Sequence, residues 1–168
     1  GQGTYKACMR MTDLAGNISY DQTSTFVYDP NPPSLASLNA SGDNDGYINA
    51  SESSNTAALF SGFAANEFAS ASYALAPSTT NCDQNLTYGS MPLSNSSVFS
   101  TQGSYKVCIR MVDDAGNIAY AASSSIIYDV DAPSLSNLDQ AGANDGFINA
   151  DEDGLTQPLF ANFSADES

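Results

Sequence analysis

The sequence contains no histidine, no tryptophan and only four basic residues, against 19 acidic ones. Without histidine, a Ser-His-Asp or Cys-His catalytic centre is excluded within this chain. With so few basic residues, a phosphate-binding surface is excluded as well, because nucleic acids and anionic membranes are bound by clustered Lys and Arg. We therefore expect no enzymatic activity and no nucleic-acid partner.

Long apolar runs are also missing, and none approaches the roughly 20 residues that a membrane-spanning helix needs. Thr, Ser, Tyr and Val are frequent instead, and Gly and Pro interrupt them at short intervals. This composition is typical of short strands and turns. Apolar residues make up 42% of the chain, which is enough for a core. We predict an all-β fold without a membrane-spanning segment.

The first 68 residues recur, without a gap, as the last 68. About half of the positions in 1–68 are identical in 101–168; GTYKACMRMTDLAGN at 3–17, for example, returns as GSYKVCIRMVDDAGN at 103–117. A fixed period without insertions indicates tandem structural units. A period of 100 residues makes each unit a whole domain. The repeat predicts a window onto a longer array, and a duplicated two-domain protein is the alternative.

Proline and polar residues interrupt the predicted strands just before 32 and again just before 132, where domain boundaries are expected. One complete domain therefore spans 32–131. Residues 1–31 are the C-terminal part of a preceding domain, and residues 132–168 are the N-terminal part of a following one. The complete domain offers about seven short strands, with a turn signal about every ten residues; they are expected at 33–38, 56–63, 69–76, 86–93, 97–100, 103–112 and 117–129. This pattern predicts an immunoglobulin-like Greek-key β-sandwich.

The three cysteines fit the repeat. Alternation along the strand predicted at 103–112 puts Cys108 on the solvent face and the odd-numbered residues in the core. We predict that Cys108 forms a disulfide with Cys82, in the loop after the third strand, and that Cys8 pairs with a cysteine upstream of residue 1. Three free surface thiols are the alternative. The disulfide implies an oxidising, extracellular location.

The sharpest local motif is SGDNDGYINASE, residues 41–52. Interpreted as a twelve-residue calcium loop, it places Asp43, Asp45 and Glu52 at ligand positions and Gly46 at the sharp turn. The match is incomplete, because serine replaces the usual first aspartate and no helices flank the loop. The second copy, at 141–152, loses two of the ligand positions.

A calcium site shared at the junction between domains is the alternative to a self-contained loop. In a sandwich, the turn after the first strand lies at the same pole as the end of the last strand, which would bring Asp45 and Glu52 toward Asp129 and Asp131. A solvated acidic turn without metal is the third interpretation. The candidate Ca²⁺ ligands are Asp43, Asp45, Asn49, Glu52, Asp129, Asp131, Asp145 and Glu152.

Asp13 and Asp113 each begin a turn that ends in Ala-Gly-Asn. We expect their carboxylates to accept hydrogen bonds from local backbone N–H groups, while the glycines Gly16 and Gly116 adopt positive φ. A metal ligand at a domain junction is the alternative role of these aspartates.

Both ends of the unit resemble a known family. The strand and turn at 103–117 and the YDVDAP exit at 128–133 are similar to the closing hairpin of bacterial immunoglobulin-like tandem repeats, which occur in large surface adhesins and biofilm proteins. NDGYINASE at 44–52 resembles a segment near the start of such repeats. The resemblance implies an elongated, often calcium-stiffened stalk at the cell surface or secreted.

The expected function is therefore mechanical, as a spacer in an extracellular fibre or adhesin. Its partners would be neighbouring repeats of the same protein or subunits of a filament. The alternatives are a ligand-binding module for a surface glycan or protein, and accessory immunoglobulin-like domains of a large secreted hydrolase. A concave aromatic patch around Tyr73, Tyr88 and Phe99 would favour the binding module.

Overall fold

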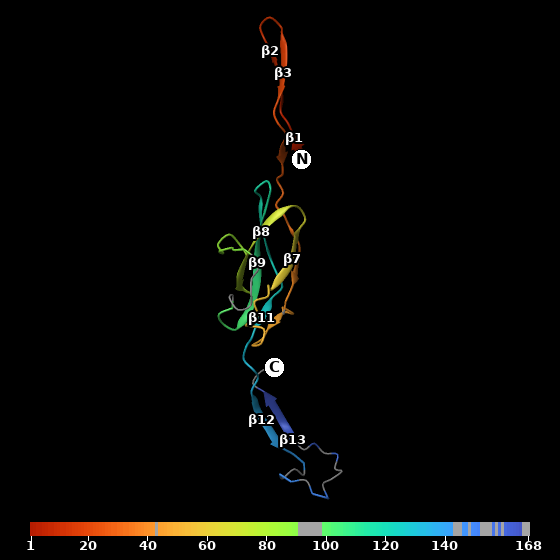
Figure 1. Cartoon of the computed structure of the whole chain (residues 1–168), viewed down its shortest axis with the longest axis vertical. Helices are drawn as coiled ribbons and strands as arrows, with labels where there is room; N and C mark the ends of the chain where they lie inside the picture. Colours follow the sequence, from red (N-terminus) through yellow and green to blue (C-terminus); the bar gives the residue numbers. More distant parts are fainter. Residues whose placement is uncertain are drawn as a thin grey trace. The chain divides into compact units, whose positions relative to one another are not determined.

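The computed structural model describes residues 1–42, 44–90, 99–142, 146–147, 149–151, 156, 158 and 160–165. The described residues form strands and turns (Figure 1), so the predicted all-β class is confirmed. None of them belongs to a helix of the length and apolarity that crossing a membrane requires. The chain divides into two compact units, Gly1–Val130 and Asp131–Ser168, which are described separately.

The larger sheet of the first unit is built around the long strand β9 (Gly103–Asp113). One edge of β9 pairs with β8 (Ala69–Pro77). The other edge pairs first with β10 (Ile118–Ala122) and then with β11 (Ile126–Tyr128), all antiparallel. The short strand β6 (Tyr47–Ile48) extends this sheet by pairing in parallel with β11.

A second, two-stranded sheet consists of β5 (Leu35–Ala40) and β7 (Phe60–Ala65). The core between the sheets is made of buried apolar side chains from both: Ile48, Leu59, Phe60, Tyr73, Val107, Ile109, Met111 and Ile126. Val107, Ile109 and Met111 of β9 face this core, as the alternation along the strand predicts. The arrangement is sandwich-like.

The last strand of the domain is interrupted, whereas the sequence predicts one continuous strand over 117–129. Ala122 pairs with Cys108 and Ile126 pairs with Tyr105, so three residues oppose two and form a bulge. The hydroxyl of Ser123 accepts the hydrogen bond of the Val107 N–H (2.9 Å) and thereby replaces a backbone carbonyl. The hydroxyl of Thr23 does the same for Ala7 in the first copy (3.0 Å).

The strands expected over 86–93 and 97–100 are not found where the structure describes these residues. Residues 86–90 contribute one isolated bridge, between Gly89 and Tyr73, and residues 99–100 lie outside any strand. Residues 91–98 lie outside the described part of the chain.

Residues 1–31 repeat the pairing of the complete domain with an offset of 100 residues. β1 (Gly3–Tyr5) pairs with β4 (Phe26–Tyr28) as β9 pairs with β11, and β2 (Cys8–Thr12) pairs with β3 (Ile18–Gln22) as β9 pairs with β10. β1 and β2 are separated at residues 6–7, where β9 continues unbroken and is paired with β8.

In the second unit, β12 (Leu135–Gln140) pairs with β13 (Phe160–Ala165). The pairing follows that of β5 with β7, including both register shifts, again with an offset of 100 residues. The backbone thus reproduces, in both flanking pieces, the strand pairing of the corresponding parts of the complete domain.

Candidate functional site: an acidic joint between repeats

The turn after β9 is held by the Asp113 carboxylate. It accepts hydrogen bonds from the backbone N–H of Asn117 (2.8 Å) and from the Asn117 side-chain amide (2.8 Å). Gly116 adopts φ of 89° and lets the chain reverse. The first copy repeats this arrangement with Asp13, Gly16 and Asn17. The predicted local role of both aspartates is confirmed.

Asn117 also holds the segment that leads into the complete repeat. Its side-chain amide donates to the backbone carbonyls of Asp29 (2.9 Å) and Asn31 (3.1 Å). Pro33, just beyond these residues, is buried. One asparagine therefore shapes its own turn and attaches that turn to the linker from the preceding repeat.

This contact was missed in the sequence analysis, which placed a boundary at the linker and assigned it no partner. The contact between the turn and the linker could have been predicted from two motifs that occur together. Each copy carries an Ala-Gly-Asn turn, at 15–17 and 115–117, and each carries a Tyr-Asp exit, at 28–29 and 128–129.

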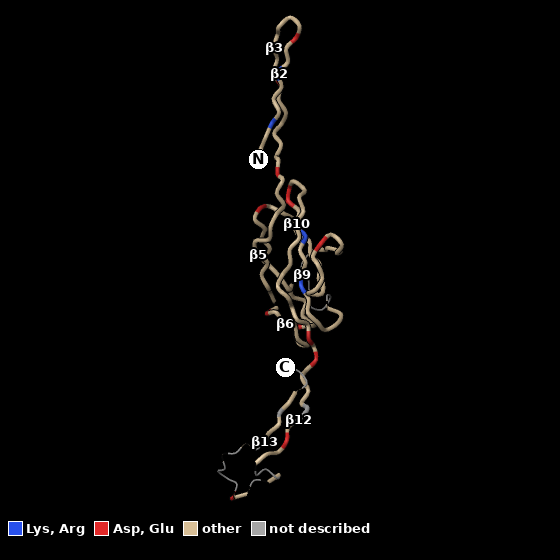
Figure 2. The backbone as a smooth tube through the Cα atoms, turned by 180° about the vertical axis from the view of Figure 1, so that it is seen from behind, with Lys and Arg blue, Asp and Glu red and all other residues tan. Residues whose placement is uncertain are grey.

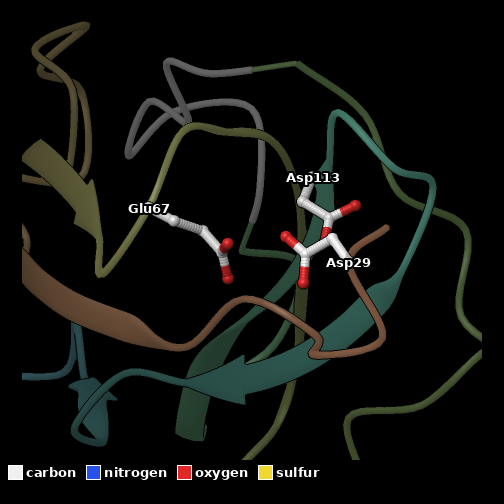
Figure 3. Close-up of side chains that lie close together, drawn as sticks. All are labelled: Asp29, Glu67 and Asp113. Atoms are coloured by element: carbon white, nitrogen blue, oxygen red, sulfur yellow. The ribbon is translucent and has the colours of Figure 1, made fainter. Parts of the chain in front are cut away.

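Three carboxyl groups meet at the same joint (Figure 3). Asp29 comes from the linker, Glu67 from the turn between β7 and β8, and Asp113 from the end of β9. Their carboxylate oxygens lie within 4.8 Å of one another; Asp113 is buried, and the other two are half-buried. A cavity of about 350 Å³ adjoins them, lined in part by Val27 and Phe68.

The pKa values of two carboxyl groups in this cluster, Glu67 and Asp113, are shifted in opposite directions. Desolvation raises the pKa of Glu67, and the negative charges of Asp29 and Asp113 and a hydrogen bond shared with Asp29 raise it further. Burial also acts to raise the pKa of Asp113, but its hydrogen bonds from Asn117 and from the backbone of Ala115 and Gly116 outweigh burial and lower it. Asp113 therefore keeps its charge, and Glu67 is the group that takes up a proton.

The geometry of the cluster suits a hard cation or a proton. Ca²⁺ takes carboxylate and carbonyl oxygens at about 2.3–2.6 Å, so ligands on opposite sides of one ion lie roughly 5 Å apart. The spread of 4.8 Å among the three carboxylates is compatible with that spacing. Acidic residues elsewhere lie mostly on turns and linkers (Figure 2).

The predicted calcium loop uses its polar side chains for local hydrogen bonds. Asp45 accepts from the Tyr47 N–H (3.0 Å), and Glu52 accepts from the Asn49 N–H (2.9 Å). The Asn49 side chain accepts in turn from the backbone N–H of Ser51 (2.8 Å). These hydrogen bonds stabilise local turns, and calcium binding by this loop stays a prediction.

The loop lies beside the end of the last strand, as the sandwich argument predicts. Ile127 donates its N–H to the Gly46 carbonyl (2.9 Å), and Asp129 donates to the Ile48 carbonyl (3.0 Å). Asp131 belongs to the second unit. The other candidate ligands, Asp43, Asp145 and Glu152, lie outside the described residues.

Within the described part of the chain, the one group of three acidic side chains close enough to share an ion is Asp29, Glu67 and Asp113. Of these residues, the sequence analysis considered a metal-binding role only for Asp113. Asp129, a predicted ligand, occupies the repeat position of Asp29, and position 167 is again a glutamate. The acidic residues of the joint thus recur with the period of the repeat.

Cys82 and Cys108 form a disulfide, with their Cα atoms 5.2 Å apart, so the predicted pair is present. The predicted solvent exposure of Cys108 is wrong, because its exposed fraction is 0%. The loop carrying Cys82, Leu86 and Tyr88 folds over the outer face of β8 and β9 and makes a second small core there. Cys8 is exposed, and its pairing stays a prediction.

The aromatic residues that would have formed a binding patch lie in different environments. Tyr73 is buried in the core. Phe99 stacks on Tyr128, with ring centroids 4.8 Å apart, and Tyr88 lies against Tyr120 at 5.8 Å. Tyr73, Tyr88 and Phe99 therefore do not form a shared exposed surface.

Comparison with protein-family models and with curated proteins finds no match for this chain.

We expect Asn117→Ala to weaken the joint by about 1–3 kcal/mol more than Asn17→Ala does, because each net hydrogen bond contributes roughly 0.5–1.5 kcal/mol. Both variants remove the side-chain hydrogen bond that the asparagine donates to the aspartate of its own turn. In the part of the chain that the structure describes, Asn117 also donates to the linker carbonyls, and Asn17 has no such contact. Urea unfolding of the two variants measures the difference. Equal losses would show that the linker contacts contribute nothing.

The joint should also respond to pH through Glu67. Because its pKa in the folded state lies above the ordinary value of 4.5, stability is lost as pH rises from 4.5 through the raised value. Thermal unfolding in EDTA should therefore give a higher midpoint at pH 5 than at pH 7, and Glu67→Gln should reduce that difference. Asp13 and Asp113 have lowered pKa values and lose stabilisation only below about 3.8.

Glu52→Gln is the matched control for this pH measurement, because Glu52 lies outside the acidic cluster. Glu52→Gln should leave the difference in unfolding midpoint between pH 5 and pH 7 as it is in the original chain. An unchanged dependence in Glu67→Gln would contradict the assignment to the joint.

Proposed function

We propose that the chain is a structural repeat module of an extracellular bacterial fibre or adhesin, built from immunoglobulin-like Greek-key domains with a period of 100 residues. Its role is mechanical, as a spacer along the fibre. The observation that carries this proposal is the joint, in which Asn117 bonds the carbonyls of Asp29 and Asn31. A spacer that transmits extension needs ordered joints, and hydrogen bonds to the linker backbone supply that order.

Two further features support the proposal. The disulfide between Cys82 and Cys108 suits an oxidising compartment outside the cytoplasm. The closing hairpin and the segment at 44–52 resemble those of bacterial surface repeats. Neighbouring repeats or filament subunits are then the partners of this module.

Backbone ¹⁵N relaxation of the 168-residue chain tests the spacer function. We expect residues 1–28 and 34–130 to tumble with one rotational correlation time, because the joint holds them together. Asn117→Ala should separate the two values, whereas Asn17→Ala should not. Independent tumbling of the two parts in the original chain, with and without calcium, would overturn the proposal.

The proposal includes Ca²⁺ as an ion that stiffens the joint, bound by Asp29, Glu67 and Asp113. Extracellular calcium modules have Kd values of about 10⁻⁴–10⁻³ M, so 10 mM Ca²⁺ should stabilise the chain by about 1.4–2.7 kcal/mol relative to EDTA. Thermal and urea unfolding under non-reducing conditions measure this gain.

Two double variants then locate the ion. Asp29→Asn with Glu67→Gln should abolish the gain, whereas Asp45→Asn with Glu52→Gln should preserve it. The reverse pattern would move the ion to the loop at 41–52. Identical unfolding curves in calcium and EDTA would remove Ca²⁺ from the proposal. The chain would then be a spacer whose domain is stabilised by its internal disulfide, without calcium.

A further inference from the structure

The strand pair of β6 and β11 is parallel, whereas the other strand pairs of the described residues are antiparallel. Two backbone hydrogen bonds join it: Ile127 donates its N–H to the Gly46 carbonyl (2.9 Å), and Asp129 donates to the Ile48 carbonyl (3.0 Å). Within the described part of residues 32–131, this is also the strand pair that connects the first third of the domain with the last. Extension of the chain through the domain therefore requires this pair to open.

The chain enters and leaves the complete domain at opposite ends of its longest strand. The linker is bound by Asn117, in the turn that follows Asp113 at one end of β9, and Tyr128 pairs with Gly103 at the other end. β9 has 11 residues, so the points of entry and exit are roughly 35 Å apart. Tension that reaches the domain from both sides therefore acts along its strands.

The parallel direction of β6 and β11 decides how such tension reaches their hydrogen bonds. Tension from the preceding side pulls β6 toward its own N-terminal end, and tension from the following side pulls β11 toward its C-terminal end. Because the two strands run in the same direction, they are drawn past each other lengthwise, and the hydrogen bonds between them are loaded together. A load on the shared end of both strands would instead open the hydrogen bonds one at a time.

Apolar packing supports the same strand pair. Ile48 of β6 and Ile126 of β11 are each 1% exposed and belong to one buried cluster. Sliding of β6 along β11 would move these side chains out of their packing positions, and a close-packed interior resists such a shift. Tyr128 of β11 also stacks on Phe99, with ring centroids 4.8 Å apart. Hydrogen bonds and core packing therefore oppose lengthwise sliding in the same step.

We propose that β6 and β11 form a mechanical lock, which holds the domain 32–131 closed when tension acts on both sides of it. The lock deepens the proposed function and rests on it, since a spacer in a fibre is the element that carries tension. The resistance itself depends on the pairing and direction of strands within the domain, so it can be measured on the 168-residue chain.

Pulling of single molecules in two directions tests the lock. In a Cys8→Ser chain with the native disulfide intact, handles are attached through cysteines introduced at exposed positions. Pro32→Cys with Ala132→Cys loads β6 and β11 lengthwise, whereas Ser51→Cys with Ala132→Cys pulls the two strands apart from the end that they share. Attachment at position 32 keeps the contacts of Asn117 with the linker outside the loaded segment.

The lengthwise direction should need at least about twice the unfolding force at the same loading rate, because two hydrogen bonds of similar energy share the load. The length of chain released identifies the event, since the disulfide excludes its 26 residues from extension. Unfolding should release roughly 260 Å of extended chain between positions 32 and 132, and roughly 190 Å between positions 51 and 132.

Three variants at the end of β11 test the hydrogen bond that Asp129 donates. Asp129→Pro removes the N–H that bonds the Ile48 carbonyl and should lower the lengthwise force, whereas Asp129→Ala keeps that N–H and should not. Val130→Pro is the matched proline control, because the Val130 N–H bonds the side chain of Gln102 and the repeat counterpart, residue 30, is a proline. Urea unfolding reports whether each variant folds, and the comparison of the two directions stands without these variants.

Equal unfolding forces in the two directions would overturn the proposal, and so would a folded Asp129→Pro chain whose lengthwise force is unchanged. Either result would leave the spacer function standing, because that function is tested by the shared tumbling of residues 1–28 and 34–130. Independent tumbling of those two parts would in turn remove the spacer function, while a difference in force between the two directions would remain a property of the domain.

Discussion

Met111→Ala will lower the free energy of unfolding of the complete repeat by about 2–5 kcal/mol, the usual loss when a large core side chain is truncated. Met111 is buried among apolar side chains from both sheets, and the truncation leaves a cavity there. Urea unfolding, monitored by circular dichroism, gives the value.

Met11→Ala is the matched control, because Met11 occupies the same repeat position but is half exposed. Its effect should stay within about 0.5 kcal/mol, as for an ordinary surface substitution. A similar loss of stability in the two variants would mean that the side chain of Met11 is buried in solution, as that of Met111 is.

Removal of the disulfide, as Cys82→Ala with Cys108→Ala, should cost about 3.5 kcal/mol, the loop-closure value for a separation of 26 residues. Alanine at 108 is preferable to serine, because Cys108 is fully buried beside Ala74 and Ala76, and burying a hydroxyl without a hydrogen bond costs free energy. Unfolding under non-reducing conditions measures the loss.

Cys8→Ala is the control for the disulfide, since Cys8 is exposed on the first hairpin. It should leave the unfolding of the complete repeat unchanged, and a reducing agent should destabilise the Cys8→Ala chain as strongly as the double variant is destabilised. Equal stability of the oxidised and reduced chains would show that the loop at 82–88 is held by packing and not by the covalent bond.

The joint explains why the turn and the exit motif occur together in each copy. Asp113 orients Asn117, and Asn117 reaches the linker that carries Asp29. A residue whose local role is to close a hairpin thereby acquires a second role between repeats. The same arrangement brings the Asp113 carboxylate to the linker, where it faces Asp29 and Glu67 (Figure 3).

The sequence alone determined the features that depend on local order along the chain. Alternation placed the odd-numbered residues of β9 in the core, because strand geometry sends successive side chains to opposite faces. The Asp-x-Ala-Gly-Asn spacing predicted the turns, since the hydrogen bonds of Asp13 and Asp113 stay within four residues. The pairing of Cys82 with Cys108 was predictable because these are the two cysteines of the predicted domain 32–131.

Tertiary structure decided everything that depends on which distant segment arrives at a given place. Cys108 is buried because the loop at 82–88 covers a face that alternation alone assigns to solvent. Asp29, Glu67 and Asp113 are separated by 38 and 46 positions in the sequence, and only the docking of the linker against the β9 turn brings their carboxylates within 4.8 Å. Sequence periodicity reports which side of a strand a residue faces, whereas the free energy of that side chain depends on what packs against it.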